Sequence, residues 1–199
     1  MNELKSFEKL KDNLEKFPSI GAKSAERIAY NLLNMSDEEI EEFISNIHEV
    51  KTKIHRCPNC GLLTEQETCT ICTDPTRSHD KCILMLDSKD VGAFDKVESF
   101  NGVYHVLRCN INPGKQQTRK DSGLDEFLSR VENEKIKEVI VAFGGTIEEE
   151  ITISIVTKIL TTKNIKVSRI ARGIPRGQTL EYVDSLTLSD ALDGRIEIK

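Results

Sequence analysis

The sequence predicts an α+β fold made of several modules. Apolar residues recur at helical intervals through the first part of the chain, four cysteines then follow in two close pairs, and after them short apolar runs alternate with helical patterns. We therefore expect a helical domain over residues 1–53, a four-cysteine module over 54–78, an α/β sheet domain over 79–172 and a C-terminal extension over 173–199.

The composition is that of a folded globular chain. Of its 199 residues, 38% are hydrophobic and 31% are charged, which excludes a mostly disordered protein. No apolar run approaches the roughly 20 residues that span a bilayer, and the first residues lack the apolar stretch of a signal peptide, so we expect a cytoplasmic protein with no membrane partner. The net charge of −5 excludes a chain that is basic throughout, although a local basic patch still allows contact with nucleic acid.

Three amphipathic helices are expected before residue 54. Pro18 ends the first pattern, the second opens after Gly21, and the third starts at Ser36, which forms a capping-box pattern with Glu39. The apolar positions of the three patterns are, in chain order, Leu4, Phe7, Leu10, Leu14 and Phe17, then Ala22, Ala25, Ile28, Ala29 and Leu32, then Ile40, Phe43, Ile44 and Ile47.

Strands and helices are expected to alternate after the cysteines. Apolar runs predict strands at 82–86, 103–107, 138–143 and 166–171, and helical patterns lie between them at 91–98, 124–131 and 147–160. This alternation indicates a mainly parallel sheet that is covered on both faces. Residues 110–123 are rich in Asn, Pro, Gly, Lys and Gln and are predicted to form a long mobile loop.

The strongest single motif is the cysteine cluster. Cys57, Cys60, Cys69 and Cys72 are spaced C-x2-C-x8-C-x2-C. Two such pairs can turn four thiolates toward one point, which satisfies tetrahedral zinc and leaves no position for water. The alternative, redox-active or simply buried cysteines, fits the paired spacing poorly. We therefore predict a structural zinc ion, and we expect the other two cysteines, at positions 82 and 109, to be small buried residues outside the site.

The segment FPSIGAKSA at residues 17–25 resembles a helix-hairpin-helix motif. A hairpin at this point exposes backbone N–H groups at the start of a helix, where the partial positive charge favours a phosphate group. Gly21, Lys23, Ser24 and Arg27 are therefore predicted to bind the DNA backbone without sequence preference. Ser19 stands where the motif usually has its first glycine. The alternative is an ordinary helical turn with solvated basic residues.

Acidic residues follow two of the predicted strands. Asp87 comes after ILML, and Glu148 and Glu150 come shortly after EVIVAF. Because the carboxyl ends of parallel strands face a common crevice, these three acids are expected to converge on one site. The arrangement resembles the Toprim domain of topoisomerases and primases, whose acids hold magnesium for phosphoryl chemistry. The Asp-x-Asp pair of that domain is absent here, so no catalytic residue is assigned, and helix capping is the alternative explanation for the glutamates.

The order of these modules is similar to one family, the bacterial recombination mediator RecR, and the match includes GVYHVL at 102–107 and VSRIARGIP at 167–175. The resemblance implies a zinc-containing DNA-binding protein that is not an enzyme. It implies a homo-oligomer, a dimer or a tetramer, that closes a ring or clamp around single- or double-stranded DNA through its N-terminal segment and through residues 173–199. The implied partners are RecO, in some systems RecF, and indirectly RecA, which is loaded onto single-stranded DNA. Asp87, Glu148 and Glu150 would then serve partner contact.

Several positions depart from the pattern of the RecR family. Asp87 stands where the family usually has Glu, Glu149 replaces the Gly of its Glu-Gly-Glu, and the pair at 108–109 replaces two glycines. Two rival hypotheses remain. A magnesium-dependent Toprim nuclease or primase would use Asp87, Glu148 and Glu150, whereas a zinc-stapled scaffold would bind protein alone.

Overall fold

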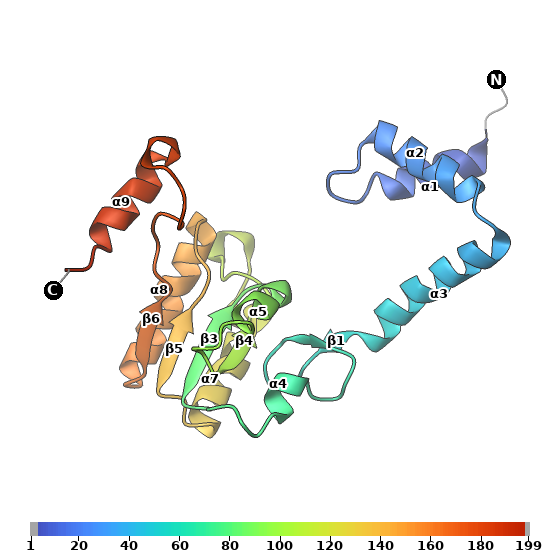
Figure 1. Cartoon of the computed structure of the whole chain (residues 1–199). Coiled ribbons are helices and arrows are strands. Elements are labelled where there is room, and N and C mark those ends of the chain that lie inside the picture. The colour runs from blue at the N-terminus through green and yellow to red at the C-terminus, as the bar shows by residue number, and fades with distance from the viewer. Residues whose placement is uncertain (1–3, 198–199) are drawn as a thin grey trace. The chain divides into compact units, whose positions relative to one another are not determined.

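A computed structural model describes residues 4–197, which divide after Ile54 into two compact units (Figure 1). The first unit is helical. The second contains the cysteine module, the sheet and the C-terminal segment, so residues 55–78 share a unit with the sheet. Across the described residues, no helix combines the length and the apolar character required to cross a membrane.

Three helices make up the first unit: α1 (Lys5–Leu14), α2 (Ala22–Leu33) and α3 (Asp37–Lys53). Helices α1 and α2 pack against each other. The contact is close because α2 contributes the small, fully buried side chains of Ala25 and Ala29, while the rings of Phe7 and Tyr30 lie 4.8 Å apart. The two helices therefore form a rigid base for the turn that joins them.

The first two apolar patterns are partly exposed, contrary to the prediction. Helix α1 ends at Leu14, before it reaches Phe17, which directly precedes Pro18 and is 59% exposed. Ala22 is exposed in the first turn of α2 rather than buried. The turn between the helices thus begins earlier than the apolar spacing suggests.

Helix α3 begins as predicted, with a reciprocal capping box between Ser36 and Glu39. Its apolar face, however, is left uncovered within the described chain. The exposed fractions along this face are Phe43 49%, Ile44 44%, Ile47 50% and Val50 54%. A row of large apolar side chains on one helix face is typical of a surface that binds another protein.

The second unit is built on a parallel sheet. Its strands are β3 (Lys81–Met85), β4 (Val103–Val106), β5 (Glu138–Val141) and β6 (Lys166–Arg169), in the spatial order β4-β3-β5-β6. All neighbouring strands run parallel, as the alternation of strands and helices predicts. The carboxyl ends of the strands therefore meet at one edge of the sheet.

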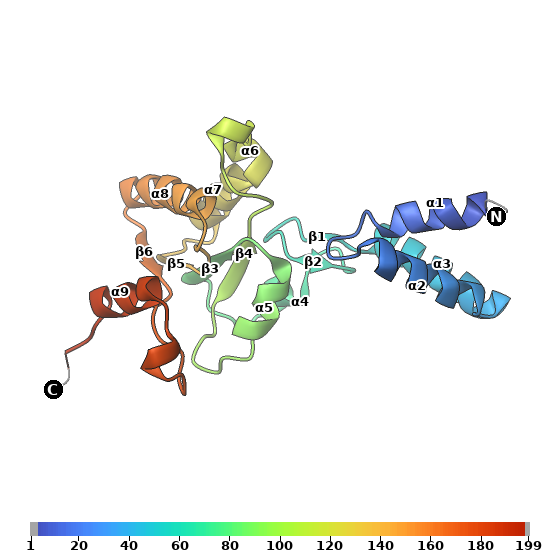
Figure 2. The same ribbon diagram turned by 90° about the horizontal axis from the view of Figure 1, so that it is seen from above.

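Both faces of the sheet are covered (Figure 2). The main covering helices are α5 (Ser88–Phe94), α7 (Leu124–Asn133) and α8 (Ile147–Thr162). On one face Leu84 packs with Phe127 of α7 and Val156 of α8. On the other face Met85 packs with Val91 of α5 and with the cysteine module. Adjacent residues of β3 thus face opposite layers, as the period of two in a strand requires.

Two connecting segments contain more regular structure than expected. Residues 110–123, predicted as a mobile loop, hold the 3-10 turn η1 (Pro113–Lys115) and the short helix α6 (Arg119–Ser122), which Thr118 and Asp121 cap. Helix α5 begins at Ser88, earlier than the predicted start, because Asp87 caps it. The C-terminal segment holds η2 (Leu180–Tyr182) and α9 (Ser185–Asp193).

Candidate functional site

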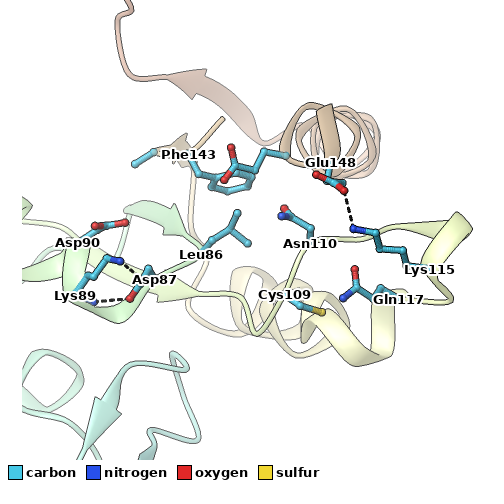
Figure 3. Close-up of a pocket in the computed structure, with 12 residues that line it drawn as sticks. Leu86, Asp87, Lys89, Asp90, Cys109, Asn110, Lys115, Gln117, Phe143 and Glu148 are labelled. Atoms are coloured by element: carbon cyan, nitrogen blue, oxygen red, sulfur yellow. Dashed lines mark hydrogen bonds and ion pairs between the residues drawn. The ribbon is translucent and has the colours of Figure 1, made fainter. Parts of the chain in front are cut away.

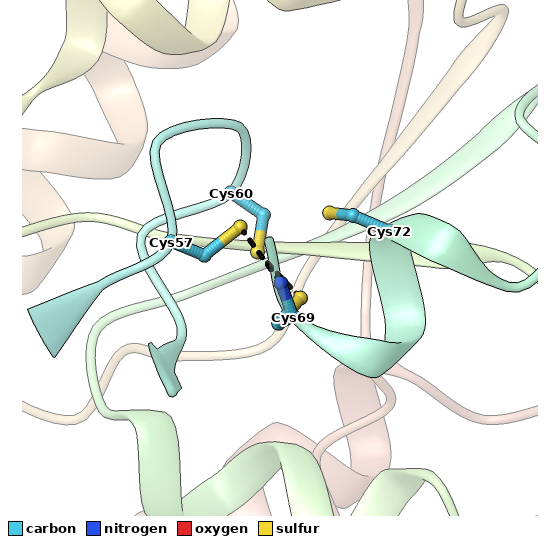
Figure 4. Close-up of side chains that lie close together, drawn as sticks. All are labelled: Cys57, Cys60, Cys69 and Cys72. Carbon is cyan, nitrogen blue, oxygen red and sulfur yellow. Dashed lines mark hydrogen bonds between the residues drawn. The ribbon is translucent and has the colours of Figure 1, made fainter. Parts of the chain in front are cut away.

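Two cysteine pairs meet beside the sheet (Figure 4). They are carried by the antiparallel strands β1 (His55–Arg56) and β2 (Leu63–Thr64) and by α4 (Thr70–Thr73). The Sγ atoms of Cys57, Cys60, Cys69 and Cys72 all lie within 4.8 Å of one another, and those of Cys60 and Cys69 are 3.5 Å apart. Thiolates ~2.3 Å from one tetrahedral zinc ion lie ~3.8 Å from one another, so this ligand set fits zinc.

The first cysteine pair is attached to the edge strand β4. The backbone N–H of Val106 donates a hydrogen bond to the carbonyl oxygen of Cys60 at 2.7 Å. Gly61 has a φ of +74°, and a Cβ at this position would lie 2.2 Å from the carbonyl oxygen of Val106, so only glycine fits. The cysteine module thereby covers part of a sheet edge that would otherwise be open.

The cysteines differ from one another in environment. The pKa of Cys72 is lowered, first by the hydrogen bond from the Cys60 side chain and then, against the effect of burial, by the charge of Arg130. Burial instead raises the pKa of Cys82 to about 12, because its side chain lies fully inside the sheet core. Cys109 lies apart from the four clustered sulfur atoms, beside a cleft. Cys82 and Cys109 are both outside the metal centre, as expected, but Cys109 is only partly buried, contrary to the prediction.

The helical hairpin places its basic side chains at the start of α2. Gly21 is the N-cap residue, in an extended conformation, and a Cβ there would have nothing within 4 Å. Within the described chain no side chain caps α2, and its first turn holds no acidic residue. Lys23, Ser24 and Arg27 are exposed, and the side chains of Lys23 and Arg27 make no hydrogen bond or ion pair with other residues of 4–197. The N–H groups of this helix end remain open to an anion.

Ser19 adopts the backbone conformation that glycine would supply. Its φ is +66°, in the left-handed region, so the hairpin keeps its turn although the residue carries a side chain. This conformation costs a non-glycine residue about 1–2 kcal/mol. The departure from the usual motif is therefore a departure in residue type and not in backbone path.

Replacing Ser19 with Gly is expected to stabilise the α1–α2 pair by about 0.5–1 kcal/mol, since relief of the left-handed strain exceeds the entropy that glycine loses on folding. Amide hydrogen exchange of α2 measures this directly, and exchange should become slower. Ser19→Val should act in the opposite direction, because a β-branched side chain tolerates positive φ poorly. Faster exchange in Ser19→Gly would contradict the assignment.

A cleft of about 630 Å³ lies at the carboxyl edge of the sheet (Figure 3). Asp87, which follows β3, and Glu148, in the first turn of α8, both line it, together with Asp90 and Glu149. Glu150 does not line this cleft. The structure therefore brings two of the three predicted acids to one place.

Each of the three acids is paired with a cation. Asp87 pairs with Lys89 at 2.9 Å, and Glu148 pairs at 2.9 Å with Lys115, which belongs to the segment predicted as a mobile loop. These partners hold the pKa values of Asp87 and Glu148 below their usual range, in each case first through the lysine side chain. Glu150 accepts hydrogen bonds from Arg169 at 2.5 Å and from Arg172 at 2.6 Å.

Sequence reasoning did not find these lysine partners. Lys89 follows Asp87 closely, but i,i+2 spacing carries no signal for an ion pair, and Lys115 reaches Glu148 only through the tertiary fold. Among residues 4–197, the four cysteines are the one group of three or more His, Cys, Asp or Glu side chains whose ligand atoms lie close enough to share a metal ion.

Comparison with known proteins identifies the family. Family models described as the RecR helix-hairpin-helix, the RecR zinc finger domain of four cysteines and the Toprim domain match residues 7–51, 54–74 and 80–171. The middle match contains all four clustered cysteines, which are thus the ligands of a structural zinc ion. The predicted fold class is confirmed.

Curated relatives match along nearly the whole chain. The recombination protein RecR of Streptococcus thermophilus is 38% identical over 190 residues, 96% of each chain. RecR of Clostridium perfringens is 42% identical over 193 residues, 97% of each chain, and RecR of Bifidobacterium animalis subsp. lactis is 38% identical over 193 residues, 97% of this chain and 96% of its own. The chain belongs to the RecR family of recombination proteins, and its role lies in DNA recombination and repair.

Proposed function

We propose that this protein is a recombination mediator of the cytoplasm rather than an enzyme. It forms a ring or clamp on single- or double-stranded DNA and acts with RecO, and in some systems with RecF, to load RecA onto single-stranded DNA. The observation that carries the proposal is the open N-terminus of α2, where the N–H groups have no side-chain cap and the neighbouring cations Lys23 and Arg27 have no ion-pair partner among residues 4–197.

DNA contact is assigned to Gly21, Lys23, Ser24 and Arg27. The extended Gly21 leaves the helix end accessible, because apart from its chain neighbours no described residue has an atom within 4 Å of the position of a Cβ. A phosphate group at this end would be attracted by the helix dipole and by both cations. Contacts of this kind recognise the sugar-phosphate backbone, so binding would be independent of base sequence and sensitive to salt.

Assembly into a dimer or tetramer is supported by apolar side chains at two places in the chain. The first is the face of α3 formed by Phe43, Ile44, Ile47 and Val50, which are 44% to 54% exposed. The second is the C-terminal segment, where Leu180 is 62% exposed, Tyr182 77%, Leu186 71% and Leu192 66%. A monomer rarely exposes such rows of large apolar residues, and two separate surfaces allow a closed ring of identical subunits.

The acids of the sheet edge are assigned to partner contact. Asp87 and Glu148 line one cleft, but each is already neutralised by a lysine, which leaves them unlike the free carboxylates that hold catalytic magnesium. Glu150, in the first turn of α8, contributes from outside the cleft, where Arg169 and Arg172 hold it. A partner that carries its own charged side chains could exchange with these exposed ion pairs at little cost.

A loading assay tests the proposed function. RecA filament formation on single-stranded DNA that is covered by single-strand-binding protein should proceed faster when this protein and RecO are both present. The double variant Asp87→Asn, Glu148→Gln should bind DNA normally and lose the stimulation roughly tenfold, since each exposed charge pair lost at an interface costs up to about 1 kcal/mol. Asn retains the capping ability of Asp87.

The matched control removes two acids outside the cleft, with the double variant Asp125→Asn, Glu126→Gln at the start of α7. It should stimulate loading like the unchanged protein. If both double variants stimulated loading equally, the cleft would not be the partner contact. If the unchanged protein gave no stimulation, the proposed mediator function would be wrong.

A further inference from the structure

Arg130 is a charged residue in the interior of the second unit. It lies on α7, and its side chain is only 5% exposed. Its guanidinium group uses three nitrogen atoms: Nη1 donates to the carbonyl oxygen of Tyr104 at 2.7 Å, Nε donates to Glu134 at 2.8 Å, and Nη2 donates to the Sγ atom of Cys72 at 3.9 Å. One side chain thus joins α7, the edge strand β4 and the second cysteine pair.

Burial of this cation requires compensating negative charge. A buried guanidinium without a partner is strongly unfavourable, and Glu134, which also contacts His79 at 2.7 Å, supplies a single carboxylate. A zinc ion held by four thiolates carries a net charge of about −2. The zinc centre therefore supplies the additional negative charge that the buried Arg130 requires. In turn, Arg130 offsets part of the negative charge of the four clustered thiolates.

The contact falls on the ligand that burial protects least. Cys57, Cys60 and Cys69 are 1% to 2% exposed, whereas Cys72 is only partly buried. A proton or a competing chelator reaches the metal centre most easily at the thiolate that is least buried. The Nη2 group of Arg130 lies against that sulfur atom.

We propose that Arg130 is a positioning residue of the zinc centre. It fixes the Cys72 thiolate through a charge-assisted N–H···S hydrogen bond and anchors that thiolate to β4 through the Tyr104 carbonyl group, so that zinc leaves slowly. The planar guanidinium fork is essential, because a lysine cannot donate in three directions that are set by one rigid group. Partners of metal ligands of this kind typically change metal affinity by about 10- to 100-fold.

Zinc release to a chromogenic chelator tests the proposal on the zinc-loaded full-length protein. Arg130→Met and Arg130→Lys should release zinc roughly 10- to 100-fold faster than the unchanged protein. Arg119→Met removes an exposed arginine that pairs with Asp125 and should release zinc at the original rate. Val131→Ala creates a cavity on the same helix, next to Arg130, and controls for a general loss of stability.

A second measurement separates a contact to sulfur from a general structural role. In the cobalt-substituted protein, the thiolate-to-metal charge-transfer band should move to lower energy in both Arg130 variants, because loss of the hydrogen bond raises the energy of the sulfur electrons. Val131→Ala should leave this band in place. If Arg130→Met does not fold, the zinc release rate and the band position of Arg130→Lys test the proposal instead.

Faster zinc release together with the band shift, in Arg130 variants alone, supports the proposal. Unchanged release in Arg130→Lys, or equal acceleration in Val131→Ala with no band shift in any variant, overturns it.

Discussion

Simultaneous replacement of Lys23 and Arg27 by Ala is expected to weaken DNA binding on the order of 10- to 100-fold near physiological salt, because two charge-assisted contacts to phosphate groups are lost. The slope of log affinity against log salt should become shallower by about 1.4 per subunit engaged on single-stranded DNA, since fewer counterions are released. Electrophoretic or fluorescence titration over a range of salt concentrations measures both effects.

The structure predicts that this loss leaves folding intact. Both side chains are exposed and unpaired within the described residues, so their removal breaks no internal contact. The double variant Lys9→Ala, Lys51→Ala removes the same charge from exposed positions of α1 and α3 and serves as the control. If the two double variants bound DNA equally well, the hairpin would not be the contact surface.

Loss of one zinc ligand should have the largest effect on stability. Cys60→Ser is expected to abolish stoichiometric zinc binding and to lower the free energy of unfolding of the second unit by several kcal/mol, because the binding energy of a structural zinc ion is also folding energy. The sheet should also be destabilised, since the Cys60 carbonyl group accepts the hydrogen bond from Val106 and the cysteine module covers the edge strand β4.

Metal analysis together with thermal unfolding measures this effect. Cys109→Ser is the matched control, because Cys109 is a partly buried free thiol outside the metal centre. It should retain zinc and unfold close to the original midpoint. Full zinc content and an unchanged midpoint in Cys60→Ser would contradict the assignment of the ligand set.

Features that depend on short stretches of chain could be predicted from the sequence. The zinc ligands lie in two close pairs, so their spacing alone determines that the sulfur atoms can meet. The capping box at Ser36 follows from residues three positions apart. The parallel sheet follows from alternating strand and helix patterns.

Features that depend on tertiary distance could not be predicted. Arg130 and Glu134 are four residues apart on a helix, a spacing that also describes a surface ion pair, and only the fold shows that the guanidinium group is buried against Cys72. In the same way, the sequence predicts that Glu150 converges with Glu148 on one site, but it does not reveal that two arginines bind Glu150 and that Glu150 does not line the cleft.

The exposure of the apolar face of α3 also could not be predicted from the sequence. Its spacing predicts a helix with one buried face, and the helix is present, but Phe43, Ile44 and Ile47 are 44% to 50% exposed within the chain. Periodicity shows that a face is suited to burial. It does not show whether the covering surface belongs to the same chain or to another one.

Contact with DNA through its phosphate groups can be measured by titrating the zinc-loaded, unmodified protein with single-stranded DNA of several base sequences over a range of salt concentrations. Binding at low salt is expected to be nearly independent of base sequence, and the logarithm of the affinity should fall linearly with the logarithm of the salt concentration. Absence of binding to every DNA at low salt, by protein with full zinc content, would contradict the proposed DNA contact.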